Sequence, residues 1–163
     1  MKIQKISPDH NRPLYQLIRQ ILESHQLNHH GTAYTDPELK NLSDYYHSRP
    51  DAGYFVLLDE KNEVIGGAGY APFSQNTCEL QKLYIHKNFR GRGLGKRLIL
   101  EVMRHAAKQY DTIYLETHSK LIEAHNLYRS QGFQTLERPH PQSLHSAMDI
   151  WMQRRLTIEK IDQ

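Results

Sequence analysis

The feature that most constrains the fold is a basic, glycine-rich segment, Arg90-Gly91-Arg92-Gly93-Leu94-Gly95. Residues 80–85 before it are predicted to form a β-strand, and residues 96–107 after it carry apolar side chains at helical spacing. A loop between a strand and a helix start presents unpaired backbone N–H groups and the positive end of the helix dipole. Because glycine lets the backbone approach a bulky anion closely, we predict a diphosphate-binding loop here.

The spacing of the glycines distinguishes this loop from two common phosphate-binding loops. A P-loop requires Ser or Thr after the lysine, and no such residue follows Lys96. A dinucleotide-binding loop requires Gly-x-Gly-x-x-Gly, whereas the glycines here stand at every second position.

Two segments together resemble the GNAT N-acetyltransferase superfamily. The pattern Arg90-x-x-Gly93-x-Gly95 is similar to its acetyl-CoA loop. Downstream, residues 124–133 resemble its second motif, Ala-x-x-Leu-Tyr-x-x-x-Gly-Phe. The residues around Asp36-Pro37 and Leu115-Glu116-Thr117 are similar to a bacterial branch that acts on small molecules.

This resemblance implies an α/β fold with a mixed, mostly antiparallel central sheet flanked by helices, in which two parallel strands splay apart. The length of 163 residues suits a single domain over 1–163. Helices are expected to begin near Pro13, at Asp36-Pro37, after Gly95 and after Ser119, which we expect to act as the N-cap. Strands are expected at residues 2–6, 54–58, 64–70, 79–85, 113–116, 133–137 and 147–152, with a polar tail at 156–163.

Three glycines, Gly66, Gly67 and Gly69, stand inside one predicted strand. Glycine weakens a strand, so its presence indicates either the close approach of another backbone or ligand, or a bulge or bend. The residues leave these alternatives open.

The resemblance also implies how acetyl-CoA would be held. The backbone of Leu83, Tyr84 and Ile85 would pair with the pantetheine arm. The pyrophosphate would be bound by Arg90, Gly91, Arg92, Gly93, Leu94, Gly95 and Lys96. One position departs from the family pattern: Leu121 stands where many members carry a pantetheine-binding Asn.

Acetyl transfer to an amine needs a group that accepts the amine proton and a group that protonates the leaving thiolate. By resemblance, Tyr128 is the candidate general acid. Glu79, at the start of the strand that leads to the loop, is the candidate general base, and Glu116 is its rival. Tyr128 on a helix stripe and Glu79 at a strand end are also compatible with purely structural roles.

We therefore expect an acetyl-CoA-dependent N-acetyltransferase that acts on a primary amine of a small molecule or peptide by direct attack on the thioester. A non-catalytic acyl-CoA-binding or regulatory module is the alternative. The formal net charge of +3 is mild, so we expect no nucleic-acid partner. The apolar runs are far shorter than the roughly 20 residues of a membrane span, so we expect no membrane partner.

The remaining expectations concern metals, location and assembly. The sequence has eleven histidines but no His-Glu-x-x-His and no His–Cys cluster, so no metal site is predicted. A single cysteine, Cys78, and an N-terminus without an apolar leader fit a cytoplasmic protein. The oligomeric state is left open, with a homodimer as one option.

Overall fold

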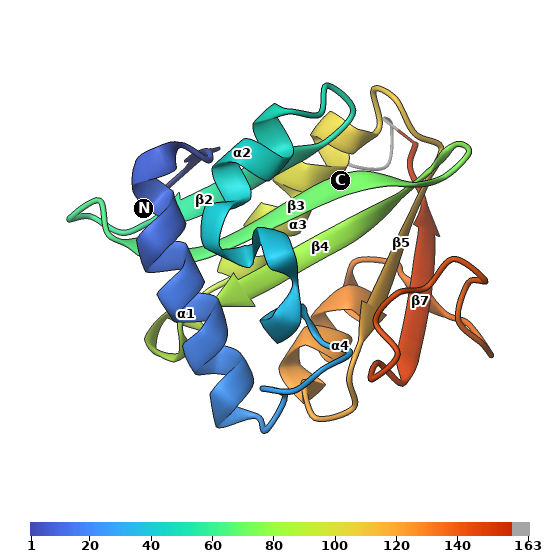
Figure 1. Cartoon of the computed structure of the whole chain (residues 1–163). Coiled ribbons are helices and arrows are strands. Elements are labelled where there is room, and N and C mark those ends of the chain that lie inside the picture. The colour runs from blue at the N-terminus through green and yellow to red at the C-terminus, as the bar shows by residue number, and fades with distance from the viewer. Residues whose placement is uncertain (158–163) are drawn as a thin grey trace.

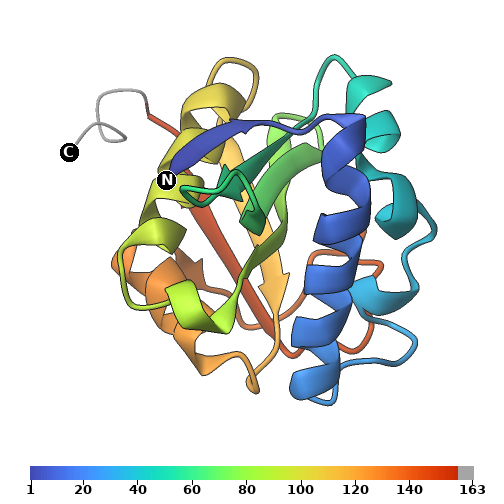
Figure 2. The ribbon, with the colours of Figure 1, turned by 90° about the vertical axis from the view of Figure 1, so that its left-hand side faces the viewer.

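In the computed structural model, which describes residues 1–157, a seven-stranded sheet lies between two layers of helices (Figures 1 and 2). The strand order is β1-β2-β3-β4-β5-β7-β6. The strands are β1 (Lys2–Lys5), β2 (Gly53–Leu58), β3 (Val64–Ser74), β4 (Thr77–Ile85), β5 (Thr112–Thr117), β6 (Gln134–Thr135) and β7 (Ile150–Arg155). The helices are α1 (Asn11–Ser24), α2 (Leu42–His47), α3 (Leu94–Ala106) and α4 (Ile122–Ser130).

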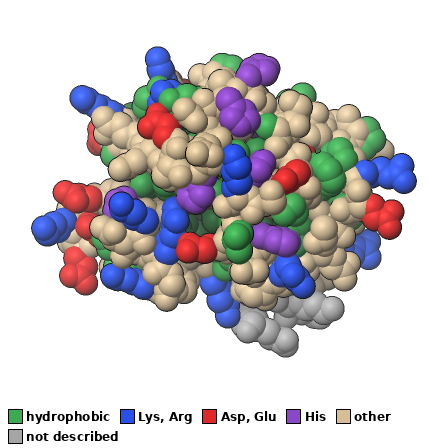
Figure 3. Space-filling model, turned by 90° about the horizontal axis from the view of Figure 1, so that it is seen from below, with side chains coloured by type: hydrophobic (Ala, Val, Ile, Leu, Met, Phe, Trp, Pro, Cys, Tyr) green, Lys and Arg blue, Asp and Glu red, His purple; other side chains and the backbone are tan. Residues whose placement is uncertain are grey.

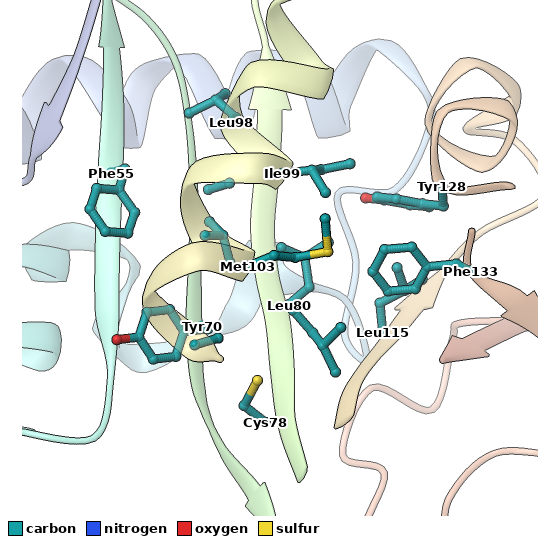
Figure 4. Close-up of a cluster of buried hydrophobic side chains, with 14 of the residues drawn as sticks. Phe55, Tyr70, Cys78, Leu80, Leu98, Ile99, Met103, Leu115, Tyr128 and Phe133 are labelled. Carbon is teal, nitrogen blue, oxygen red and sulfur yellow. The ribbon is translucent and has the colours of Figure 1, made fainter. Parts of the chain in front are cut away.

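Both faces of the sheet are buried, which is why β2 is apolar along most of its length rather than alternating. Phe55 and Leu57 of β2 join one core with α3, and Figure 4 shows this cluster. Tyr54 and Val56 point to the opposite face and join a second core with α1 and α2. The sheet therefore separates a layer with α3 and α4 from a layer with α1 and α2.

The predicted fold class is confirmed, including the splayed parallel pair. All neighbouring strands are antiparallel except β4 and β5. These two strands pair only at their starts, where the last partners are Glu79 and Tyr114. Beyond that point they diverge, as Figure 1 shows, and the separated strand ends leave backbone groups without a β-ladder partner from the neighbouring strand.

The glycines of β3 accommodate both a side chain and a backbone. A Cβ at Gly67 or Gly69 would lie 2.6 or 2.5 Å from the ring of Tyr54. A Cβ at Gly66 would lie 2.8 Å from the carbonyl oxygen of Tyr84. The predicted close approach of another backbone is thus correct at Gly66 and also at Gly69, where the carbonyl oxygen of Gly53 would lie 2.6 Å from a Cβ, whereas the Tyr54 ring from β2 occupies the space at Gly67. The alternative, a bulge, is present as well, since the register with β4 shifts between Gly67 and Gly69.

Several predicted boundaries were wrong. The last strand covers 150–155 rather than 147–152, and β6 has two residues rather than the five of 133–137. The helix expected at Asp36-Pro37 begins as a 3-10 helix, Pro37–Asn41, before α2. Asp36 does not cap it through its side chain, because that carboxylate binds Lys82 and His145. Of the expected polar tail, residues 158–163 lie outside the described residues.

Ser119 is not the N-cap of α4. Its backbone N–H and its hydroxyl donate to the carboxylate of Asp149 at 2.8 and 2.7 Å, so the side chain is engaged by the loop before β7. Leu121 takes the N-cap position without a side-chain hydrogen bond. Within residues 1–157, no helix is long and apolar enough to cross a membrane.

Candidate active site

A cavity of about 820 Å³ lies where β4 and β5 separate. It continues to the start of α3, along α4 and to the end of α1. Figure 3, which views the molecule from below Figure 1, shows a hollow in this face with Lys, Arg and His side chains around it. The sequence motifs described above therefore converge on one continuous pocket.

The glycine-rich loop forms one end of the pocket. Gly91 and Gly93 have φ values of 71° and 73°, a left-handed conformation that favours glycine. Gly93 is the N-cap of α3, so the free N–H groups of the first helical turn point out of the helix beside it. A Cβ at either glycine would have no atom within 4 Å, which means that the loop is open on that side.

Gly95 has a different role from the other two glycines. A Cβ there would lie 2.5 Å from Cδ2 of Leu127. The absence of a side chain lets α3 and α4 pack closely, and this contact joins the two family-like motifs. The loop thus needs glycine for conformation at two positions and for packing at the third.

The basic side chains of the loop are not equivalent. Arg90 lines the pocket, and its Nε donates to the carbonyl oxygen of Ile85 at 3.0 Å. Lys96 is exposed and also lines the pocket. Arg92 does not line it; its guanidinium lies 5.3 Å from the ring centroid of Phe89. Of the predicted loop residues, Arg92 alone is absent from the pocket wall.

Leu83, Tyr84 and Ile85 line the pocket at a bulge in β4, which contains Lys82 and Leu83. Gly67 pairs with Tyr84 and Gly69 with Gln81, so one residue of β3 faces two residues of β4. Lys82, within this bulge, has a φ of 51°. A left-handed conformation costs a residue other than glycine about 1–2 kcal/mol, so surrounding contacts must hold it.

Two carboxylates face the pocket from the splayed strands. Glu79 is only 8% exposed, and its Oε1 accepts a hydrogen bond from Gln81 Nε2 at 2.7 Å. Burial raises the pKa of Glu79 above its ordinary value. Glu116 accepts a hydrogen bond from Ser143 Oγ at 2.5 Å, and its other oxygen is buried without a partner among residues 1–157. Both predicted candidates for the base therefore lie in the same pocket.

Tyr128 lies on α4 between the pocket and the core. Its ring packs against Phe133 with centroids 5.9 Å apart, and in Figure 4 its hydroxyl points from α4 toward α3 and β4. Burial raises the pKa of Tyr128, so the phenol stays protonated at neutral pH and is able to donate. The same side chain is thus part of the core and part of the pocket wall.

A charged network at the other end of the pocket was not recognised from the sequence. Lys82 Nζ lies 2.6 Å from Asp36 Oδ2 and 3.3 Å from Glu38 Oε1. His145 Nε2 donates to the other oxygen of Asp36 at 3.1 Å. The sequence predicts only a helix start at Asp36, and His145 belongs to none of the predicted motifs. No local signal could have joined them, since they stand 109 positions apart.

Comparisons with known proteins agree with this geometry. The family model described as "Acetyltransferase (GNAT) family" matches residues 14–133. The chain is 33% identical over 159 residues to the uncharacterized N-acetyltransferase YjgM of Escherichia coli K12, covering 94% of each chain.

Solved structures of acetyltransferases share the fold. A GNAT acetyltransferase from Staphylococcus aureus Mu50 has a TM-score of 0.87 at 22% identity, covering 96% of this chain and 99% of that one. A phosphinothricin acetyltransferase from Sinorhizobium meliloti, in complex with AcCoA, has a TM-score of 0.72 at 22% identity, covering 95% and 88%.

Proposed function

The chain belongs to the acetyltransferase (GNAT) family and is an acetyltransferase, and from this premise we propose that it transfers the acetyl group of acetyl-CoA to a primary amine of a small molecule or peptide. One observation carries the proposal. The glycine loop, the part of β4 that β5 leaves unpaired, two carboxylates and a protonated tyrosine line one pocket.

The loop end of the pocket suits the diphosphate of acetyl-CoA. Gly91 and Gly93 leave open space where a side chain would project, and the first turn of α3 offers N–H groups with the positive end of its dipole. Arg90 and Lys96 add positive charge on the pocket wall. In this proposal the backbone of Leu83, Tyr84 and Ile85 pairs with the pantetheine arm, because β5 does not pair with this part of β4.

Direct attack forms a bond between the amine nitrogen and the thioester carbon and breaks the carbon–sulfur bond. The amine loses one proton and the thiolate gains one, so the two proton transfers balance. We assign the first to Glu79, whose raised pKa brings it nearer to that of an amine. We assign the second to Tyr128, and an N–H of the β4 backbone stabilises the charge that develops on the thioester oxygen.

Glu116 is the rival base. It faces the same pocket and has an oxygen without a hydrogen-bond donor among the described residues. Glu79 is favoured because it stands at the last paired position before the strands separate and because its pKa is raised. Apolar side chains from α1 and the loop after it, Ile21, Leu22 and Leu27, complete the acceptor end and suit an amine with an apolar body.

The test measures acetyl-CoA turnover with a panel of amines, and the release of free CoA thiol is the readout. The panel should contain alkyl monoamines, diamines, amino acids and short peptides, each with an uncatalysed control. We expect thiol release with at least one primary amine and none with the matching tertiary amine. Binding of CoA without turnover on any amine would instead favour the acyl-CoA-binding module.

A further inference from the structure

We infer that Lys82 is a positioning residue: through Asp36 it fixes the bulge of β4 in place and ties it to the acceptor-side loop, residues 136–149. The inference rests on the proposed function, in which the backbone after the bulge holds the acetyl donor. Lys82 itself is not assigned any contact with the reacting atoms.

The bulge sets the direction of the β4 backbone that lines the pocket. It inserts one extra residue into β4 between Gln81 and Tyr84, within the segment after Glu79 that β5 leaves unpaired. Such an insertion bends the strand and redirects the residues that follow. Lys82 adopts its left-handed conformation at this position, so an ordinary side chain stands where glycine would be expected.

Two contacts hold this conformation from opposite ends of the residue. At the backbone, the hydroxyl of Tyr54 donates to the carbonyl oxygen of Lys82 at 2.8 Å in a buried hydrogen bond. Tyr54 reaches it across β3, over the space that Gly67 and Gly69 leave. At the side chain, Nζ pairs with Asp36 and Glu38.

The side-chain contact is deeply buried. The Lys82 side chain is 4% exposed, against 15% for Asp36 and 23% for Glu38. Burial alone would lower the pKa of Lys82, but the two carboxylates outweigh it and raise that pKa. A lysine that remains charged and gives its hydrogen bonds to two carboxylates is not available as a proton acceptor. This is why we assign it positioning rather than proton transfer.

Asp36 links Lys82 to the acceptor-side loop. Its second oxygen accepts from His145 in that loop, and the backbone N–H of Ala147 donates to the carbonyl oxygen of Gly31 at 3.2 Å. His145 and Met148 both line the pocket. One carboxylate therefore connects the backbone proposed to hold the donor with a wall proposed to meet the acceptor.

The experiment compares Lys82→Met with the double change Lys82→Met and Asp36→Asn. Methionine keeps the length of the stem but removes the charge that faces Asp36, and this mostly buried carboxylate then keeps only His145 as an ion-pair partner. In the double variant that charge is gone, while the Asn oxygen still accepts from His145. Lys61→Met, an exposed lysine in the turn between β2 and β3, is the matched control. The readouts are thermal midpoint, CoA affinity by calorimetry, and kcat with the best amine of the panel.

We expect Lys82→Met to lower the thermal midpoint and to lower kcat by about 10- to 100-fold, the range produced by a small misplacement of reacting groups. The double variant should recover most of the thermal midpoint but not kcat, and its CoA affinity should stay weakened. The inference is overturned if kcat and CoA affinity recover together with the midpoint, or if Lys82→Met leaves both unchanged. If Lys82→Met does not fold, the double variant decides by the same criteria.

Failure of the proposed function can be told apart from failure of this inference. Wild-type protein that binds CoA but acetylates no amine contradicts the proposed function. The role of Lys82 is then decided by CoA affinity alone, which the two Lys82 variants should weaken and Lys61→Met should not. Wild-type protein that does not bind CoA overturns both.

Discussion

The two ends of the pocket are constructed in different ways. The loop end consists of backbone from one continuous stretch, from Leu83 to Lys96, with glycines that open it. The proposed acceptor end combines apolar side chains of α1 with charged side chains from separate segments: Glu79, Glu116 and His145 line it, and Asp36 lies behind His145. The loop end depends on the conformation of one local segment. The acceptor end depends on the fold, which brings charges that are distant in the sequence together.

This difference has an energetic consequence. Backbone N–H groups at a helix start are preorganised by the helix itself and require no titratable partner. Buried charges must be paired or they destabilise the fold. Changes at the loop end should therefore reduce ligand binding with little effect on stability, and changes at the acceptor end should alter both stability and pH dependence.

The largest expected effect comes from Gly93→Val. A β-branched residue resists a φ of 73°, and its side chain would fill the open face of the loop, so CoA binding should be abolished. Gly132→Val is the matched control, because Gly132 has a similar φ of 82° but follows α4 and does not line this pocket. Calorimetry on both folded variants makes the measurement. Equal CoA affinity in the two variants would contradict the diphosphate-binding loop.

Tyr128→Phe tests the group at the junction of the two ends. It keeps the packing against Phe133 but removes the donor, so we expect kcat to fall roughly 30- to 300-fold while acetyl-CoA affinity stays within about threefold. The control is Tyr110→Phe, which removes a buried hydroxyl bonded to the carbonyl oxygen of Asp51. That variant should lose stability and keep kcat. If Tyr128→Phe behaves like the control, the tyrosine serves only the core.

At pH 7, Glu79→Gln should lower the activity of the protein but raise its stability. At pH 7 we expect kcat/KM for the amine to fall about 30-fold, below the usual range for a general base because Glu116 shares the pocket. The gap should narrow at high pH, where the amine is already neutral. A pH–rate profile parallel to that of the wild type would remove Glu79 from the mechanism, and the same profile for Glu116→Gln tests its rival.

The same substitution should also raise the thermal midpoint at pH 7. The folded protein raises the pKa of Glu79, so it binds the proton more tightly than the unfolded chain does. The stability gained from this proton is fully present at pH values below the ordinary pKa of a glutamate. It is lost as the pH rises through the pKa of Glu79 in the folded protein. Glutamine should therefore gain stability over glutamate at pH 7 and not at pH 4, as thermal unfolding at both pH values would reveal.

The smallest expected effect is at His145. Its hydrogen bond with Asp36 raises its pKa, so its contribution to stability is full below its ordinary pKa and is lost as the pH rises through the folded value. His145→Gln should therefore lower the thermal midpoint by about 2–4 °C at pH 6, the shift expected for 1 kcal/mol in a chain of this size, and by less at pH 9. The exposed His29 provides the control, since His29→Gln should change neither value. A constant difference across pH would contradict the ion pair.

The sequence by itself determined the loop end of the pocket. Arg90, Gly93 and Gly95 stand within six residues, and conformation at that range follows from local chemistry: strand, left-handed glycine, helix start. The apolar stripe of α3 followed for the same reason, whereas the mixed sheet was implied by the family resemblance. Even there, the need for glycine at position 95 is explained by a contact with Leu127 on another helix. The sequence shows Leu127 as part of the second motif but not its contact with Gly95.

Only the tertiary structure decided the acceptor end. Asp36 meets Lys82 and His145 because a bulge in β4 turns the lysine toward the 3-10 helix and because the loop before β7 returns to the same place. The glycines of β3 were visible in the sequence, but the Tyr54 ring that they accommodate comes from a strand fixed by sheet register. Long-range electrostatic pairs leave no periodic or spacing signal, because their energy depends on distance in space and burial, and the chain sets neither until it has folded.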